Sequence, residues 1–161
     1  MNLFLDTNVV IDYLAKRESF AEDIYRLIMA CSSRDWQLSI SALSFTTIYY
    51  VLHKQYEHKQ LLDLLSDVRK AFCVCDVDGE IIKHALHSDF HDFEDAVQCF
   101  TAQKADADVI ITRNVKDFVS SPILVKTPKE FNDILSGYGY NSESSSSLLN
   151  EPTTVYGQNR D

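Results

Sequence analysis

Apolar positions along the chain follow two alternating periods. Short apolar runs typical of buried strands are separated by stretches in which apolar side chains recur every three or four residues, as on one helix face. The runs predict strands near residues 2–5, 36–40, 71–75, 109–111 and 123–125. Because strands alternate with helices throughout, the pattern predicts an α/β fold with a central parallel sheet of about five strands, covered on both faces.

Polar residues just ahead of apolar stretches predict where several helices begin. Ser19 and Glu22, and likewise Thr127 and Glu130, have the spacing of a capping box. A further helix is expected to begin at Asp92, with a buried stripe made of Phe93, Ala96, Val97 and Phe100.

The chain divides into two parts by composition. Residues 1–137 carry the alternating periods and are predicted to form one domain. Residues 138–161 include four consecutive serines and show no apolar periodicity. We therefore expect 138–161 to be a disordered C-terminal tail.

Composition narrows the class of protein. Hydrophobic residues make up 45% and charged residues 24%, as in ordinary globular domains. No apolar run approaches the roughly 20 residues of a membrane span, and the N-terminus does not resemble a signal peptide. We expect a cytoplasmic protein without membrane contact. The cysteines form neither a redox motif nor a zinc-ligand spacing, and Cys73 and Cys75 are expected to be small buried hydrophobes.

The net charge of −9 argues against a broad basic surface for nucleic acid. It does not exclude a metal-dependent nuclease, because a bound cation inverts the local field. Any nucleic-acid site must therefore be local.

Acidic residues stand where the predicted strands end and a helix begins. Asp6 follows the first strand, Asp117 follows a later one, and Asp92 and Asp95 lie in the first turn of a helix. Loops at the carboxyl ends of parallel strands converge at one sheet edge. Two carboxylates about 4 Å apart repel by roughly 4 kcal/mol at an effective dielectric of 20, and Mg²⁺ with oxygen ligands would remove that repulsion.

Each acid also has a simpler interpretation. Asp6 and Asp92 could serve only as helix N-caps, and Asp117 and Asn114 could be ordinary turn residues. Glu94 points away from Asp92 and Asp95 on a helical wheel, which predicts a solvated surface charge.

Three segments in this order resemble the PIN domain family, and within it the VapC-type toxins of bacterial toxin–antitoxin pairs. They are Phe4-Leu5-Asp6-Thr7-Asn8-Val9, Asp92-Phe93-Glu94-Asp95-Ala96 and Ile111-Thr112-Arg113-Asn114-Val115-Lys116-Asp117-Phe118. The resemblance covers about residues 1–136. It implies an α/β/α sandwich, an acidic pocket that binds Mg²⁺ or Mn²⁺, and a metal-dependent endoribonuclease that cleaves RNA by an activated water. It further implies an antitoxin protein as partner, and a homodimer.

The resemblance also assigns roles to individual residues. Asp6, Asp95 and Asp117 match the metal-binding and catalytic acids, with Asp92 as a nearby catalytic helper. The residues expected to contact water or substrate phosphate are Thr7, Asn8, Thr47, Thr112, Arg113, Asn114 and Lys116.

One position departs from the family pattern. The family usually carries a Glu in the helix after the second strand, and Thr47 occupies that position here. A hydroxyl can bond a metal-bound water but supplies no charge. Two alternatives therefore stay open: a PIN-like RNA-binding or assembly module with weakened catalysis, and a phosphate-binding regulator of the receiver type. The receiver type requires a Lys at the end of a strand, and no suitable Lys is present.

Overall fold

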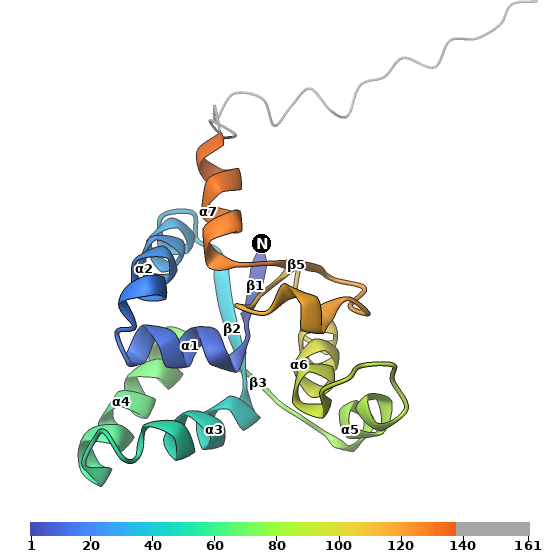
Figure 1. The fold of residues 1–161 in the computed structure, drawn as a ribbon, viewed down its shortest axis with the longest axis horizontal. Helices are drawn as coiled ribbons and strands as arrows, with labels where there is room; N and C mark the ends of the chain where they lie inside the picture. Colours follow the sequence, from blue (N-terminus) through green and yellow to red (C-terminus); the bar gives the residue numbers. More distant parts are fainter. Residues whose placement is uncertain (138–161) are drawn as a thin grey trace, which may run out of the picture.

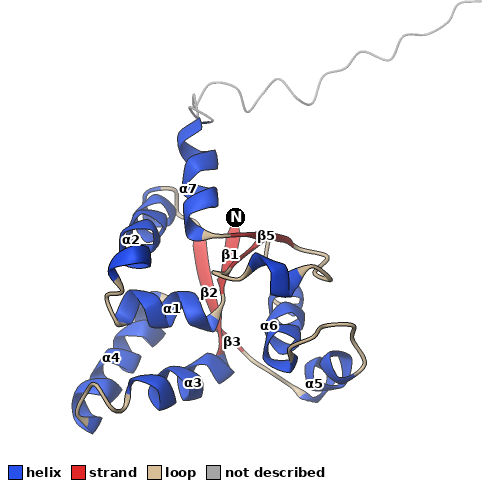
Figure 2. Ribbon diagram, viewed as in Figure 1, coloured by secondary structure: helices blue, strands red, loops and turns tan. Residues whose placement is uncertain are grey.

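The computed structural model describes residues 1–137 and contains one parallel sheet of five strands (Figures 1 and 2). The strands lie in the order β3-β2-β1-β4-β5. Their bounds are β1 Asn2–Leu5, β2 Gln37–Ser41, β3 Cys73–Cys75, β4 Val109–Ile111 and β5 Leu124–Lys126. All four pairings are parallel, in register from Leu3 opposite Leu38 and Val109.

Helices connect the strands at almost every step, as the apolar periods predict. They are α1 Thr7–Leu14, α2 Glu18–Ser33, α3 Ala42–Leu52, α4 His58–Ala71, α5 Gly79–Leu86, α6 Phe93–Lys104 and α7 Pro128–Gly137, with the short 3₁₀ helix η1 at Val115–Phe118. Figure 1 shows α1 to α4 and α7 on one side of the sheet and α5 and α6 on the other. The predicted three-layer α/β/α fold is confirmed.

Alternation along β1 explains why both faces of the sheet are covered. Leu3 and Leu5 point into the larger core, which they share with α1 to α4 and α7. Phe4 points the other way, into a smaller core with Cys99 of α6 and Phe118 of η1. A strand buried on both faces needs apolar residues at every position, and Leu3, Phe4 and Leu5 provide them.

The strand order reverses direction at β1. The chain passes from β1 outward through β2 to β3, and then crosses to the other side of β1 to form β4 and β5. In open α/β sheets the crevice at such a switch point, at the carboxyl ends of the strands, is where ligands bind. Here that crevice lies between the ends of β1 and β4, next to Asp6 and Thr112.

Four local predictions are wrong. Strand β5 ends at Lys126, one residue later than predicted, so a Lys does stand at the end of a strand. Helix α2 begins at Glu18 after Arg17, so Ser19 is a helical residue and forms no capping box with Glu22. Cys73 is exposed because β3 is a short edge strand. Phe93 is 49% exposed, because α6 buries Ala96, Val97 and Cys99 between the sheet and α5.

Other predictions are confirmed or lie outside the described residues. The Thr127–Glu130 capping box is present, with Glu130 N–H donating to Thr127 Oγ1 at 3.1 Å. Within residues 1–137, no helix combines the length and apolar character that a bilayer crossing requires. The predicted tail at 138–161 lies outside the described residues.

Candidate metal and phosphodiester site

Asp6 is a buried acid at the carboxyl end of β1. Its side chain is 3% exposed, and its backbone N–H donates to the carbonyl of Ile111 at 2.9 Å, which ties it to β4. Asp6 occupies the N-cap position of α1, yet its side chain makes no capping hydrogen bond. The helix-capping interpretation therefore does not explain why an acid stands here.

Two neutral side chains hold the Asp6 carboxylate in place. Thr112 Oγ1 donates to Asp6 Oδ2 at 2.7 Å, and Asn8 Nδ2 donates to the same oxygen at 2.6 Å. Asn8 Oδ1 in turn accepts from the backbone N–H of Arg113 at 3.3 Å. Both side-chain hydrogen bonds are accepted by Oδ2, and neither is accepted by Oδ1. Thr112 and Asn8 thus orient Asp6 and add no positive charge.

The second acid, Asp95, faces Asp6 from the first turn of α6. It is half-buried, and Asp92 holds the N-terminus of the helix beside it. Asp92 Oδ1 accepts from the backbone N–H groups of Glu94 at 2.8 Å and Asp95 at 3.2 Å. The capping role weighed for Asp92 is therefore present, and it fixes the backbone from which Asp95 projects.

Burial and charge repulsion raise the pKa of both central carboxyls. Burial raises the pKa of Asp6 to about 6, against the opposing effect of the Thr112 hydrogen bond, and repulsion from Glu94 adds to the increase. Burial raises the pKa of Asp95 to about 7, and repulsion from Asp6, Asp92 and Asp117 raises it further. No cationic side chain of residues 1–137 is among the main causes of either shift, so the fold concentrates negative charge at this edge.

The remaining acids lie at the rim. Asp117 is exposed in η1 and still contributes repulsion at Asp95. Glu94 is exposed, as the helical wheel predicts, but its charge acts on both Asp6 and Asp95. The interpretation of Glu94 as a merely solvated charge is thus incomplete.

Arg113 is engaged in a buried ion pair. Its Nη1 donates to Asp12 Oδ1 at 3.0 Å and Oδ2 at 2.9 Å, and Arg17 Nη1 contacts Asp12 Oδ1 at 2.7 Å. The Asp12 side chain is 1% exposed. Arg113 therefore joins the loop after β4 to α1, and its expected contact with phosphate stays a prediction.

The loop after β4 forms an open hollow beside β5. A volume of about 530 Å³ is bordered by Arg113, Asn114, Lys116, Asp117, Thr127 and Glu130, together with Val115. Asn114 N–H donates to Thr112 Oγ1 at 3.1 Å. Lys116 is exposed and makes no ion pair with any of residues 1–137. Four sequence-predicted residues are thus brought together, with Lys116 as their accessible cation.

Behind the acids lies a buried polar cluster that the sequence prediction did not identify. Thr7 Oγ1 lies 2.7 Å from Ser44 Oγ, and Gln98 Nε2 donates to Thr7 Oγ1 at 2.5 Å. The only sequence signal is spacing, since Gln98 follows Asp95 by three residues and Ser44 precedes the partly buried Thr47 by three. Thr7 therefore contacts protein side chains, and its predicted contact with water or phosphate stays a prediction.

The donor set suits a hard divalent cation bound partly through water. Within residues 1–137, no three His, Cys, Asp or Glu side chains are arranged to enclose an ion. Mg²⁺ does not require such a cage, because one or two carboxylates with waters and phosphate oxygens commonly hold it. Asp6 and Asp95 are carboxylates of this kind, and burial is the main cause of the raised pKa of each.

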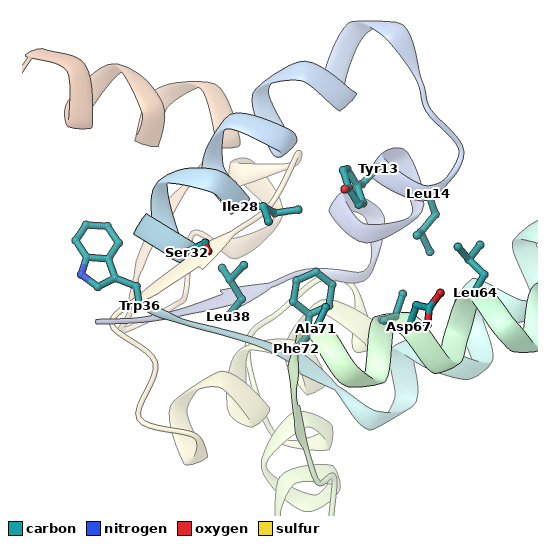
Figure 3. Close-up of a pocket in the computed structure, with 11 residues that line it drawn as sticks. Tyr13, Leu14, Ile28, Ser32, Trp36, Leu38, Leu64, Asp67, Ala71 and Phe72 are labelled. Carbon is teal, nitrogen blue, oxygen red and sulfur yellow. The ribbon is translucent and has the colours of Figure 1, made fainter. Parts of the chain in front are cut away.

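A separate apolar hollow of about 480 Å³ is lined by residues of α1, α2, β2 and α4 (Figure 3). Figure 3 shows Tyr13, Ile28, Trp36 and Leu64 around it, with Asp67 as its single acid. Lacking paired carboxylates, this hollow does not provide a metal site.

Comparison with known proteins identifies the family to which the chain belongs. The family model described as PIN domain matches residues 2–116. Ribonuclease VapC1 of Aquifex aeolicus is 30% identical over 133 residues, which are 80% of this chain and 92% of that protein.

Solved structures share the fold at lower identity. VapBC2 from Rickettsia felis, bound to a DNA fragment from its promoter, matches with a TM-score of 0.63 at 15% identity, over 79% of this chain and 98% of that one. A toxin–antitoxin complex from Klebsiella pneumoniae matches with a TM-score of 0.58 at 24% identity, over 78% and 97%. From the family-model match and the 30% identical relative, we conclude that the chain belongs to the PIN domain family.

Proposed function

We propose that this protein is a metal-dependent endoribonuclease and the toxin of a toxin–antitoxin pair. The observation that carries the proposal is the pairing of Asp6 and Asp95 at the switch point of the sheet, where both carboxyl pKa values are raised. Such a pair is stabilised by a divalent cation. The similarity to a ribonuclease over 92% of that relative supports RNA as the substrate.

The chain's own residues divide the work. Asp6 and Asp95 hold a Mg²⁺ or Mn²⁺ ion, with Asp117 at the rim of the same site. When bound, such an ion polarises the scissile phosphate and lowers the pKa of a coordinated water. Thr112 and Asn8 orient Asp6, Asp92 orients the first turn of α6, and Asn114 and Lys116 face the phosphate backbone.

The alternative of a catalytically weakened RNA-binding module depends on Thr47, which replaces a carboxylate with a hydroxyl. The site nevertheless retains two central acids and further acids at its rim, and Mg²⁺ sites commonly use only one or two carboxylates. The similarity to a ribonuclease supports the enzyme.

The test measures ion binding and RNA cleavage on the same samples. Calorimetry with Mn²⁺ and Mg²⁺ on the wild type, Asp95→Asn and Asp133→Asn should show binding that is lost only in Asp95→Asn, and cleavage should follow binding. Asp133 is a suitable control because it is an exposed acid paired with Lys129 on α7. Binding without cleavage in the wild type would favour the RNA-binding module, and no binding at millimolar ion would refute the metal site.

The proposed partner is an antitoxin protein. Similar folds occur in solved VapBC and other toxin–antitoxin complexes, which supports this partner and does not identify it. Co-expression with the product of an adjacent reading frame should relieve growth arrest caused by the wild-type chain. Arrest that Asp95→Asn leaves intact would contradict toxicity through RNA cleavage. The homodimer stays a prediction.

A further inference from the structure

Three uncharged polar side chains meet in the interior behind the acids. Thr7, Ser44 and Gln98 are 3%, 0% and 1% exposed. Besides the Thr7–Ser44 contact, Gln98 Nε2 donates to Thr7 Oγ1 at 2.5 Å and to Ser44 Oγ at 3.3 Å. These contacts join residues 91 and 54 positions apart in the chain, so the cluster is a tertiary link between α1, α3 and α6.

Two members of this cluster are close in sequence to the central acids, and the third precedes Thr47 on α3. Thr7 directly follows Asp6, so its position is tied to the end of β1. Gln98 lies three residues after Asp95 on α6, which places the two as neighbours on the helix surface. Ser44 has the same relation to Thr47 on α3. The cluster therefore connects the backbone segments that carry the two central acids.

Repulsion between the two carboxylates acts against this connection. Asp6 and Asp95 repel one another, as the pKa of Asp95 shows. Apolar packing of Cys99 against Phe4 already holds α6 on the sheet. The hydrogen bonds of Gln98 add a polar tie one turn from Asp95, which resists movement of the first turn of α6 away from the end of β1. A cation bound between them needs this restraint, because its ligands must remain close in the absence of the ion.

The contribution to stability does not explain why a Gln occupies position 98. Its Oε1 is buried and accepts no hydrogen bond from residues 1–137. A buried acceptor without a partner costs about 1–3 kcal/mol, and an apolar side chain of similar length would avoid that cost. An unsatisfied group of this kind in a native core calls for an explanation, and function is one of them.

We propose that Gln98 is a positioning residue which, through Thr7 and Ser44, fixes the separation of Asp6 and Asp95 and so sets the affinity for the divalent cation. The inference rests on the metal-dependent function proposed above and assigns a supporting role to two neutral residues that lie behind the acids, Gln98 and Ser44.

The experiment compares two variants of α6 in the full chain. Gln98→Met keeps the length of the side chain and removes its hydrogen bonds to Thr7 and Ser44. Thr101→Val is the matched control, because Thr101 is 1% exposed and its Oγ1 donates at 2.6 Å to the Val97 carbonyl within the same helix. For each protein, Mn²⁺ affinity is measured by calorimetry, and the melting temperature is measured without metal.

Gln98→Met should bind Mn²⁺ about tenfold more weakly than the wild type, within the 10–100-fold range typical when groups supporting metal ligands are removed. Its melting temperature should stay within a few degrees of the wild type. Thr101→Val should bind Mn²⁺ as the wild type does, even if it melts at a lower temperature.

Wild-type affinity in Gln98→Met would overturn the inference, as would equal weakening in Gln98→Met and Thr101→Val. If Gln98→Met does not fold, Ser44→Ala removes one hydroxyl of the cluster, and unchanged Mn²⁺ affinity there overturns the inference as well. The two proposals fail differently. A wild type that does not bind Mn²⁺ refutes the proposed function, whereas a binding wild type with an unaffected Gln98→Met refutes only the positioning role.

Discussion

Two buried acids near the start of the chain, Asp6 and Asp12, lie in opposite electrostatic environments. They are 3% and 1% exposed, so both carboxylates are removed from water. Asp12 is compensated by two cations, Arg17 and Arg113, which contact it at 2.7–3.0 Å. Asp6 accepts side-chain hydrogen bonds from two neutral residues, Thr112 and Asn8, and it lies near the acid Glu94.

This difference separates a structural acid from a functional one. A buried charge is tolerated when it is paired and hydrogen-bonded, as Asp12 is. Asp6 keeps its hydrogen bonds but has no paired cation, and its pKa is raised to about 6 as a result of burial. A buried, oriented acid without a cationic partner is suited to bind a cation from solution.

Neutralising Asp6 and Asp12 in turn is the strongest test of the difference between them. Asp6→Asn should reduce RNA cleavage by ~10³, similar to losses on removing an electrostatic catalytic group, without lowering the melting temperature. Asp12→Asn should lower the melting temperature and retain cleavage at temperatures where the protein is folded. Activity and thermal unfolding measured on both variants test this. Full cleavage by Asp6→Asn would remove Asp6 from the site.

Removing a cation from Asp12 should show the structural role directly. Arg113→Met leaves Asp12 buried with Arg17 as its remaining cation. We expect a loss of about 2 kcal/mol in the free energy of unfolding, as for hydrogen bonds to a charged group. Urea unfolding of metal-free protein measures this. Arg26→Met is the control, since Arg26 forms an exposed pair with Glu22 and should cost less than about 1 kcal/mol. Equal losses would contradict the special role of Asp12.

Stability without metal should fall as pH rises. The folded-state pKa values of Asp6 and Asp95, about 6 and about 7, lie above the ordinary Asp value of 3.8. The folded state therefore binds more protons than the unfolded state between pH 4 and 7, and its stability decreases over that window. For Asp6 the difference corresponds to about 3 kcal/mol.

Thermal unfolding in a chelating buffer from pH 5 to 8 measures this dependence. The melting temperature should drop by roughly 5–10 °C, given about 2–4 °C per kcal/mol for a chain of this size. Saturating Mn²⁺ at pH 8 should recover much of the loss, and Asp6→Asn should flatten the profile. A melting temperature that rises over the same range would contradict an uncompensated pair.

Adding a carboxylate near Asp6 and Asp95 should increase the affinity of the acidic site for a divalent cation. Thr47→Glu restores an acid where the family usually has one, and Mn²⁺ affinity should rise about tenfold because affinity follows the number of charged ligands. Thr46→Glu adds the same charge at the exposed neighbouring position of α3 and should leave affinity unchanged. Calorimetry on both variants distinguishes a ligand from a general change in charge. Equal affinities would place position 47 outside the ion's reach.

Local patterns predicted most of the fold and the two central acids. The apolar run Val109–Ile111 and the helix Thr7–Leu14 appear where period and polar boundaries place them, because both depend on neighbours in sequence. Asp6 and an acid of the pair Asp92 and Asp95 could be expected at one edge, since acids at strand ends and helix starts converge in a parallel sheet. The resemblance to the PIN domain family then selected Asp95.

Long-range partners could not be predicted in the same way. Arg113 resembled a free cation in a turn, but its partner Asp12 lies 101 residues earlier. Gln98 is one of several polar residues in α6, and its partner Thr7 lies 91 positions earlier in the chain. Cys73 is exposed because β3 pairs with a strand on one side only. The residues of a strand do not determine its place in the order of the sheet.

The smallest expected effect concerns Lys116, which forms no ion pair within residues 1–137. With Arg113 paired to Asp12, Lys116 is the basic side chain of the hollow beside β5 that can reach a phosphate. Lys116→Ala should weaken RNA binding several-fold and reduce the slope of log affinity against log salt by about 0.7, the value for one phosphate contact on a single strand. Binding is measured in an Asp95→Asn background, so that the RNA is not cleaved.

Lys70→Ala, on α4 and paired with Asp67, is the control and should change neither quantity. An unchanged salt slope in Lys116→Ala would mean that the RNA backbone does not pass this loop, and that the acidic edge binds its substrate through the metal ion alone.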